Sequence, residues 1–295
     1  VIVNPSFDSQ TKERLITPPS KFGSKPVISN KFIENIATQL DIISKVLLFA
    51  EFKETKDAKK NNGSKVRRLN IPKLDDANNA GTRKSKDCTL ILTEGDSAKT
   101  MAISGLSKIG RDNYGVFPLR GKILNVKGID IKQILKNEEI KNIIKIIGLE
   151  IGKIYTNINS LRYGKVMIMT DQDHDGSHIK GLIINIFHTL WPSLLKMDYI
   201  TSMITPIVKV TKGKKQIAFY NLYDYEEWKN KTKDNKKWSC KYYKGLGTST
   251  SKEFKEYFKT KKMVMFSHND ETNDSIDMVF NKKRADDRKS WLQNY

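Results

Sequence analysis

Three aspartates occupy alternate positions shortly after an apolar run. Asp171, Asp173 and Asp175 follow the run at 166–169, and Gly176 ends the acidic segment. Carboxylates this close together repel one another unless a cation neutralises them, and hard cations such as Mg²⁺ prefer oxygen ligands of this kind. In a chain of net charge +20, such an acidic group predicts a magnesium site.

Two other interpretations of this spacing have to be weighed. The pattern D-x-D-x-D-G also opens a calcium-binding EF-hand loop, which needs a glutamate at its twelfth position. Counted from Asp171, that position is Leu182, and the apolar run before the acids is typical of a strand rather than a helix. A solvated acidic turn is the alternative that remains if the segment is taken alone.

A second acidic group follows a second β-rich run. Glu94 and Asp96 come after the apolar residues 88–93, with Gly95 between them and a helix-like segment behind them. Acids at the ends of two strands favour an open α/β sheet, because such sheets place their sites at the carboxyl ends of the strands. We therefore expect Glu94 and Asp171 to meet in space, although they lie far apart in the sequence.

Apolar periodicity predicts the elements that must position these acids. Helices are expected at 29–52 with Ser29 as its cap, 98–106, 134–147 as the longest internal helix, 179–195, 222–230, and 251–261 with Glu253 supporting its first turn. Strands are expected at 88–93, 166–169, 207–210, 216–220 and 241–247, the third and fourth forming a hairpin around Gly213. The last thirty residues are polar, and we expect no compact element there.

Composition excludes several classes of protein. The chain has 295 residues, 38% of them hydrophobic, and no apolar run approaches the roughly 20 residues of a membrane span. No signal peptide is expected at its beginning. Cys88 and Cys240 give no disulfide framework, which suits a reducing compartment. Four histidines and two cysteines without ligand spacing argue against structural zinc.

The charge balance indicates a polyanionic partner. Lysine and arginine number 53 against 33 aspartates and glutamates, and the isoelectric point is about 9.7. A lysine-rich proteome would give the same balance, so charge alone does not decide the matter. The acidic group favours the first interpretation, because Mg²⁺ held by carboxylates in a basic protein usually faces phosphates.

Several motifs together resemble one family. Residues 94–99 and 171–176 look like the TOPRIM signature, and 118–126 narrows the resemblance to type IIA topoisomerases. Segments similar to the eukaryotic enzymes lie at 4–13, 72–78 and 244–251. The resemblance covers essentially the whole chain, with the motifs in the family's order.

This resemblance implies an α/β fold. The expected architecture is a Rossmann-like parallel TOPRIM sheet flanked by helices, with an added hairpin and an N-terminal transducer helix. The implied domains are the transducer end with its Gln-Thr-Lys loop and long helix at 1–55, a charged linker at 56–87, the TOPRIM core at 88–206, its extension at 207–260, and the start of a winged-helix region at 261–295.

The resemblance also assigns site residues. The family's metal ligands correspond to Glu94, Asp171 and Asp173, with Asp175 in support; Glu94 would also exchange a proton with the sugar 3′-oxygen, and Arg120 would assist catalysis. The implied DNA contacts are Lys99, Arg120, Lys122, Asn125, His178, Lys244, Gly245 and Gly247, the glycines allowing close approach of the backbone. For His178, capping or packing is the alternative. The ATP γ-phosphate would be reached from Gln10 and Lys12.

The activity implied is ATP-dependent, Mg²⁺-assisted cleavage and religation of double-stranded DNA by transesterification. Two metal ions are expected when DNA is bound. The nucleophilic tyrosine and the ATPase fold are expected outside these residues, so the chain alone should be inactive. Expected partners are double-stranded DNA, the remainder of the same polypeptide and a second copy of the protein in the nucleus, with no membrane. Another TOPRIM enzyme, such as a primase or a nuclease, and a non-catalytic DNA-binding module are the alternatives.

Overall fold

A computed structural model describes residues 5–7, 15–23, 29–39 and 69–294. The chain divides into two compact units, residues 1–65 and 66–295, and each is described by itself. Among the described residues, no helix is long and apolar enough to cross a membrane.

The described part of the first unit contains one α-helix and a short irregular segment. Helix α1 (Asn30–Gln39) begins after Ser29, whose Oγ accepts a 3.2 Å hydrogen bond from the Phe32 amide, so the predicted cap is confirmed. A 3₁₀ turn, η1 (Pro19–Lys21), precedes it. The predicted continuation of the helix to residue 52 lies outside the described residues, as do Gln10 and Lys12.

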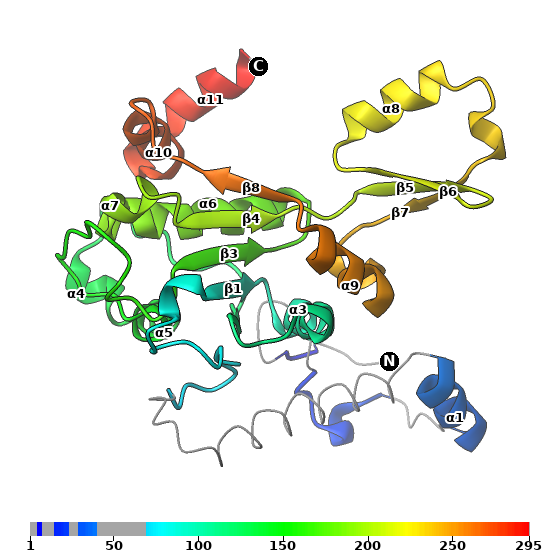
Figure 1. The fold of residues 1–295 in the computed structure, drawn as a ribbon, viewed down its shortest axis with the longest axis horizontal. Coiled ribbons are helices and arrows are strands. Elements are labelled where there is room, and N and C mark those ends of the chain that lie inside the picture. Colours follow the sequence, from blue (N-terminus) through cyan, green and yellow to red (C-terminus); the bar gives the residue numbers. More distant parts are fainter. Residues whose placement is uncertain (1–4, 8–14, 24–28, 40–68, 295) are drawn as a thin grey trace. The chain divides into compact units, whose positions relative to one another are not determined.

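A five-stranded sheet is the centre of the second unit (Figure 1). Its strands, in spatial order, are β2 (Tyr114–Pro118), β1 (Thr89–Thr93), β3 (Lys165–Met169), β4 (Ile200–Met203) and β8 (Met263–Phe266). The first four run parallel, and β8 pairs antiparallel with β4. The predicted α/β fold with a parallel sheet flanked by helices is confirmed.

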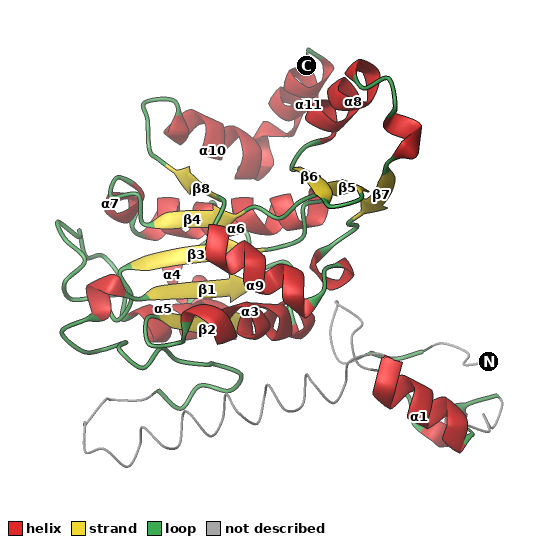
Figure 2. Cartoon of the chain, turned by 45° about the vertical axis from the view of Figure 1, so that its right-hand side comes forward, coloured by secondary structure: helices red, strands yellow, loops and turns green. Residues whose placement is uncertain are grey.

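Helices cover both faces of this sheet. Leu90 and Ile168 belong to one core cluster with apolar residues of α5 (Glu138–Ile147) and α6 (His174–Leu190). The opposite face is covered by α3 (Asp96–Ile109) and α9 (Ser251–Thr260), and Figure 2 shows α9 in front of the sheet and α6 behind it. In α3, Gly105 leaves room for Phe258 of α9, since a Cβ there would lie 2.1 Å from the ring.

Two helix predictions were wrong in their boundaries. The segment 134–147 is divided into α4 (Ile131–Ile134) and α5, because the Asn137 side chain caps the Ile140 amide and starts a new helix. The longest helix described is instead α6, with 17 residues. It starts five residues earlier than predicted and ends at Leu190, with Trp191 as its C-cap, and Pro192 then opens the short α7 (Pro192–Leu195).

The extension after β4 forms a small antiparallel sheet with its own core. Its strands are β6 (Lys215–Phe219), β5 (Val208–Lys212) and β7 (Ser239–Tyr242). The predicted hairpin is confirmed, and Gly213 in its turn has the positive φ of 60° that favours glycine. Between β6 and β7 lie α8 (Leu222–Lys231), as predicted, and the 3₁₀ turn η4 (Asn235–Lys237).

Residues 266–294 contain helices, contrary to our expectation. After β8 come α10 (Thr272–Phe280), the 3₁₀ turn η6 (Lys282–Arg284) and α11 (Ala285–Gln293). Phe280 enters the main core, where its ring lies against Gly181 of α6. The segment is mostly polar because few of its side chains face that core.

Candidate functional site

The ends of β1 and β3 bring two acidic residues together. These strands are parallel neighbours, with Thr93 level with Met169. Glu94 and Asp171 therefore emerge at the same edge of the sheet, and the Asp171 amide donates a 3.1 Å hydrogen bond to Glu94 Oε2. The expectation that these two residues meet in space is confirmed.

A loop from the extension holds the Asp171 side chain. The Leu246 amide, at the start of the 3₁₀ turn η5 (Leu246–Thr248), donates a 2.7 Å hydrogen bond to Asp171 Oδ1. Gly245 lies against the same carboxylate, because a Cβ at this position would be 2.3 Å from Oδ2. We predicted that this glycine allows close approach to DNA. The contact that the structure gives it is with the acid at the end of β3.

The two following aspartates have different partners. Asp173 caps α6, with its Oδ1 accepting a 2.8 Å hydrogen bond from the Gly176 amide. Asp175 is exposed and forms a 2.7 Å ion pair with Lys122, which lowers the pKa of its carboxyl. The turn is tight, since a Cβ on Gly176 would lie 2.1 Å from the Asp171 carbonyl oxygen.

The surroundings of Glu94 and Asp171 disfavour the ionised form of both carboxyl groups when no cation is bound. Burial raises the pKa of Glu94, and the nearby Asp171, Asp173 and Asp175 raise it further, against the hydrogen bond from the Asp171 amide. Burial and Asp173 also raise the pKa of Asp171, against the Leu246 amide. Lys180 of α6 faces the same group. Burial lowers its pKa, while Asp173 and Glu94 oppose that shift. A cation at this edge would relieve the repulsion among the carboxylates.

The donor chemistry at this edge suits a hard divalent cation, but the side chains do not form a closed cage. Glu94 and Asp171 supply half-buried carboxylates, and the Asp171 backbone amide lies within hydrogen-bond distance of the Glu94 carboxylate. Within the described ranges, no group of three or more His, Cys, Asp or Glu side chains is arranged to hold a metal ion. Asp173 is engaged in capping and Asp175 in its ion pair. An ion here would take its remaining ligands from water or phosphate, as Mg²⁺ commonly does.

Known proteins match the chain over its whole length. The Toprim domain family matches residues 89–204, and the C-terminal associated domain of TOPRIM matches 203–295. The chain is 54% identical over 305 residues to DNA topoisomerase 2 of Plasmodium falciparum and 55% identical over 303 residues to DNA topoisomerase 2-alpha of Homo sapiens. The chain belongs to the type II DNA topoisomerase family.

These matches are complete for the chain and partial for its relatives. Both alignments cover 100% of this chain, but 22% of the Plasmodium protein and 20% of the human one, so the chain spans about a fifth of their length. A crystal structure of the DNA-binding, cleavage and re-ligation domain of Plasmodium falciparum topoisomerase II superposes with a TM-score of 0.74 at 56% identity. That superposition covers 78% of this chain and 32% of the other.

Two of the residues predicted from the type II topoisomerase motifs to contact DNA have internal partners. Lys99 forms a 2.6 Å ion pair with Asp75, and its side chain is only 13% exposed. Asn125 donates a 2.9 Å hydrogen bond to the Phe280 carbonyl and accepts one of 2.9 Å from Asn185. These contacts support a role in joining segments of the core.

The other predicted contacts are exposed around the same edge as Glu94. Arg120 and Lys122 follow the end of β2, which pairs with β1 so that Pro118 is level with Thr93. His178 lies in the first turns of α6, and its charge helps to lower the pKa of Asp175. Lys244 and Gly247 lie on either side of the contact with Asp171.

Sequence reasoning missed the backbone and long-range partners of the acids. The Leu246 amide has no side-chain signature, because any residue except proline could supply it. Lys180 could have been noticed as a lysine two turns into the helix that follows the acids, but its half-buried position depends on the fold. Asp76 is a third residue that sequence reasoning missed. Its carboxylate lies inside the core and accepts hydrogen bonds from Arg162 and Tyr163.

Proposed function

We propose that the chain is the metal-binding TOPRIM part of an ATP-dependent type II DNA topoisomerase. Its role would be Mg²⁺-assisted transient cleavage and religation of double-stranded DNA. The observation that carries this proposal is the meeting of Glu94 and Asp171 at the common end of β1 and β3. Family membership supports the reaction class, and exposed basic residues around the same edge support a DNA substrate.

The chain's own residues would have distinct tasks. Glu94 is half-buried with a raised pKa, which suits a carboxyl that takes up and returns a proton at the sugar 3′-oxygen. Asp171 would present its second oxygen to the ion while the Leu246 amide fixes the first. Asp173, whose Oδ1 caps α6, would offer its other oxygen to the ion, and Asp175 would add negative charge in support. The chemistry that bound Mg²⁺ would supply is stabilisation of charge on the phosphate and leaving oxygens.

The duplex would lie along the edge lined by Arg120, Lys122, His178 and Lys244. Exposed cations bind phosphates without reading sequence and so place the DNA backbone near Glu94. Arg120 could also stabilise charge on the reacting phosphate. For Lys99 and Asn125, DNA contact would require giving up their present partners.

Several parts of the proposal concern the remainder of the protein. The nucleophilic tyrosine and the ATPase fold would be supplied by other parts of the polypeptide, with Gln10 and Lys12 reaching the ATP. Homodimer formation, a nuclear location and a second Mg²⁺ with DNA bound belong to the same proposal. They rest on the family resemblance.

A titration tests the metal site directly. Mg²⁺ binding would be measured by calorimetry for the chain with and without a short duplex, and for Glu94→Gln and Asp171→Asn. We expect weak binding that the duplex strengthens and each substitution abolishes, while Glu256→Gln on α9 leaves it unchanged. Duplex binding that is indifferent to Mg²⁺ and to both substitutions would support the non-catalytic DNA-binding alternative instead.

A further inference from the structure

The Glu253 carboxylate collects hydrogen-bond donors from several elements. Within α9 it accepts from the Thr250 amide at 2.8 Å, completing a capping box. It also accepts from Lys209 of β5 at 3.0 Å, from Lys241 of β7 at 3.2 Å, and from the Tyr243 hydroxyl. A capping box explains only the first of these contacts. The others join the small sheet to the start of α9.

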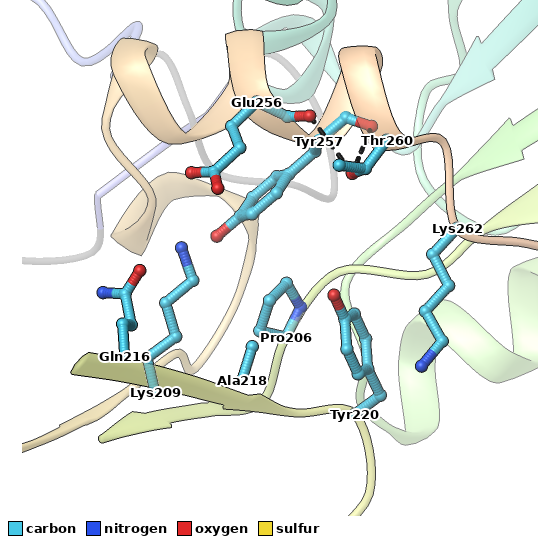
Figure 3. A pocket seen from close by; sticks show the side chains of 9 residues that line it. All are labelled: Pro206, Lys209, Gln216, Ala218, Tyr220, Glu256, Tyr257, Thr260 and Lys262. Carbon is cyan, nitrogen blue, oxygen red and sulfur yellow. Dashed lines mark hydrogen bonds between the residues drawn. The ribbon is translucent and has the colours of Figure 1, made fainter. Parts of the chain in front are cut away.

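Lys209 is the buried cation of this group. Only 5% of its side chain is exposed, and its ammonium group lies 4.7 Å from the centre of the Tyr257 ring and 5.5 Å from that of Tyr243. Figure 3 shows Lys209 reaching from β5 towards Tyr257 on α9, beside a cavity of about 410 Å³. A buried ammonium group is tolerated only when it is paired, so Lys209 and Glu253 depend on each other.

The group fixes both ends of the loop at 244–249. Tyr243 precedes the loop and Thr250 follows it, and both donate to Glu253. Between these two points, the Leu246 side chain is buried and its amide donates to Asp171. Such a short segment anchored at both ends has little freedom to move its amide away from the carboxylate.

We propose that Glu253 is a positioning residue that, with Lys209 and Tyr243, fixes the loop at 244–249 so that the Leu246 amide orients Asp171. We call these three residues the loop anchor. This inference rests on the proposed function in one respect, since it takes the oriented Asp171 carboxylate to be a metal ligand. Glu253 itself would touch neither metal nor DNA.

The test combines hydrogen exchange with metal binding. Glu253→Gln keeps the shape of the side chain but removes the charge that pairs with Lys209. We expect the Leu246 amide to lose protection by about tenfold, with little change at amides of β1 and β3. The affinity for Mg²⁺ should fall several-fold in the same variant. Glu256→Gln is the matched control, an exposed glutamate one turn later on α9, and should change neither quantity.

A second variant keeps the test decisive if Glu253→Gln fails to fold. Tyr243→Phe removes one hydroxyl donor without altering the ring, and should lower Leu246 protection in the same direction. Unchanged Leu246 protection in the folded variants would overturn the loop anchor, and so would an equal loss of protection across the whole chain. If the unsubstituted chain binds no Mg²⁺, the proposed function fails, while local loss of Leu246 protection still supports the anchor.

Discussion

Gly245 and Asp171 are in such close contact that a Cβ on the glycine would lie 2.3 Å from the aspartate Oδ2. The backbone of Gly245 is extended, with φ of −172°, a conformation that any residue can adopt. Glycine is therefore required here by space and not by backbone conformation. The acid at the end of β3 and the loop after β7 fit together only because that side chain is absent.

Gly245→Ala should accordingly disturb the site. The added methyl group must displace either the loop or the Asp171 carboxylate, and overpacking of this kind costs about 1–3 kcal/mol. We expect a lower melting temperature and weaker Mg²⁺ binding, measured by thermal unfolding and calorimetry. Gly247→Ala is the control, because no atom lies within 4 Å of a Cβ at that exposed position. Equal effects of the two substitutions would show that the close contact is not responsible.

Removing charge from Asp171 should leave the metal-free chain as stable or slightly more stable. In Asp171→Asn, the amide oxygen can still accept from Leu246, while a half-buried charge with a raised pKa disappears. Asp173→Asn should behave similarly, since asparagine is an equally good helix cap. Both effects would be measured by thermal unfolding at neutral pH. A loss of several degrees in melting temperature for both would make these acids structural.

Asp76→Asn provides the contrast. This carboxylate is buried and accepts a 2.6 Å hydrogen bond from Arg162, so neutralising it removes the charge that pairs with this guanidinium inside the core. We expect a loss of about 3 kcal/mol in the free energy of unfolding. Asp171 and Asp173 at the sheet edge should tolerate the same change, and Asp76 should not.

The contacts of each site residue determine whether its position could be predicted from the sequence. The convergence of Glu94 and Asp171 was predictable, because β-rich runs that end in acids imply neighbouring parallel strands with a shared carboxyl edge. The contact of Asp171 with Gly245 and Leu246 was not predictable. It depends on where the fold places the extension, whose Leu246 lies 75 residues after Asp171 in the sequence. A glycine in a sequence can indicate a close contact, but it does not indicate which atom is in contact with it.

The same reasoning applies to two further sets of predictions. Lys99 and Asn125 were assigned to DNA from their places in motifs, but their partners Asp75 and Phe280 come from other segments of the chain. The division of the helix at 134–147 had a readable signal in Asn137, a good helix cap followed by two glutamates. Apolar periodicity on both sides of that residue concealed it.

Stability should depend on pH through the loop anchor. Burial favours the neutral form of Glu253, but hydrogen bonds from Thr250, Tyr243 and Lys209 outweigh this effect and lower its pKa to about 2. A lowered carboxyl pKa gives stability that is present above the ordinary value of 4.5 and is lost as pH falls towards 2. Glu253→Gln should therefore be less stable than the parent chain by about 2 kcal/mol at pH 7. Urea unfolding at several pH values should show this gap closing below pH 4.5. A gap that stays constant would contradict the charge-based explanation.

DNA binding should separate the exposed lysines, Lys122 and Lys244, from the largely buried Lys99. Lys122→Ala and Lys244→Ala should each weaken duplex binding and lower the salt slope by about one, whatever the DNA sequence. Lys99→Ala should instead reduce stability and leave the slope unchanged, because it removes the ion pair with Asp75. Fluorescence anisotropy across a range of salt concentrations measures the slopes. A reduced slope for Lys99→Ala alone would reverse the assignment.

Glu94 gives the sharpest prediction for the complete protein. Cleavage and religation are the two directions of one reversible step, and a carboxyl that takes a proton in one direction returns it in the other. Glu94→Gln should therefore slow both directions by similar factors, on the order of a hundredfold or more, and leave the equilibrium fraction of cleaved DNA nearly unchanged. Single-turnover rates measured from intact and from pre-cleaved DNA test this with excess Mg²⁺, and Glu256→Gln serves as the control. If only religation slows and cleaved DNA accumulates, Glu94 does not act in both directions, and its proposed proton exchange with the 3′-oxygen is wrong.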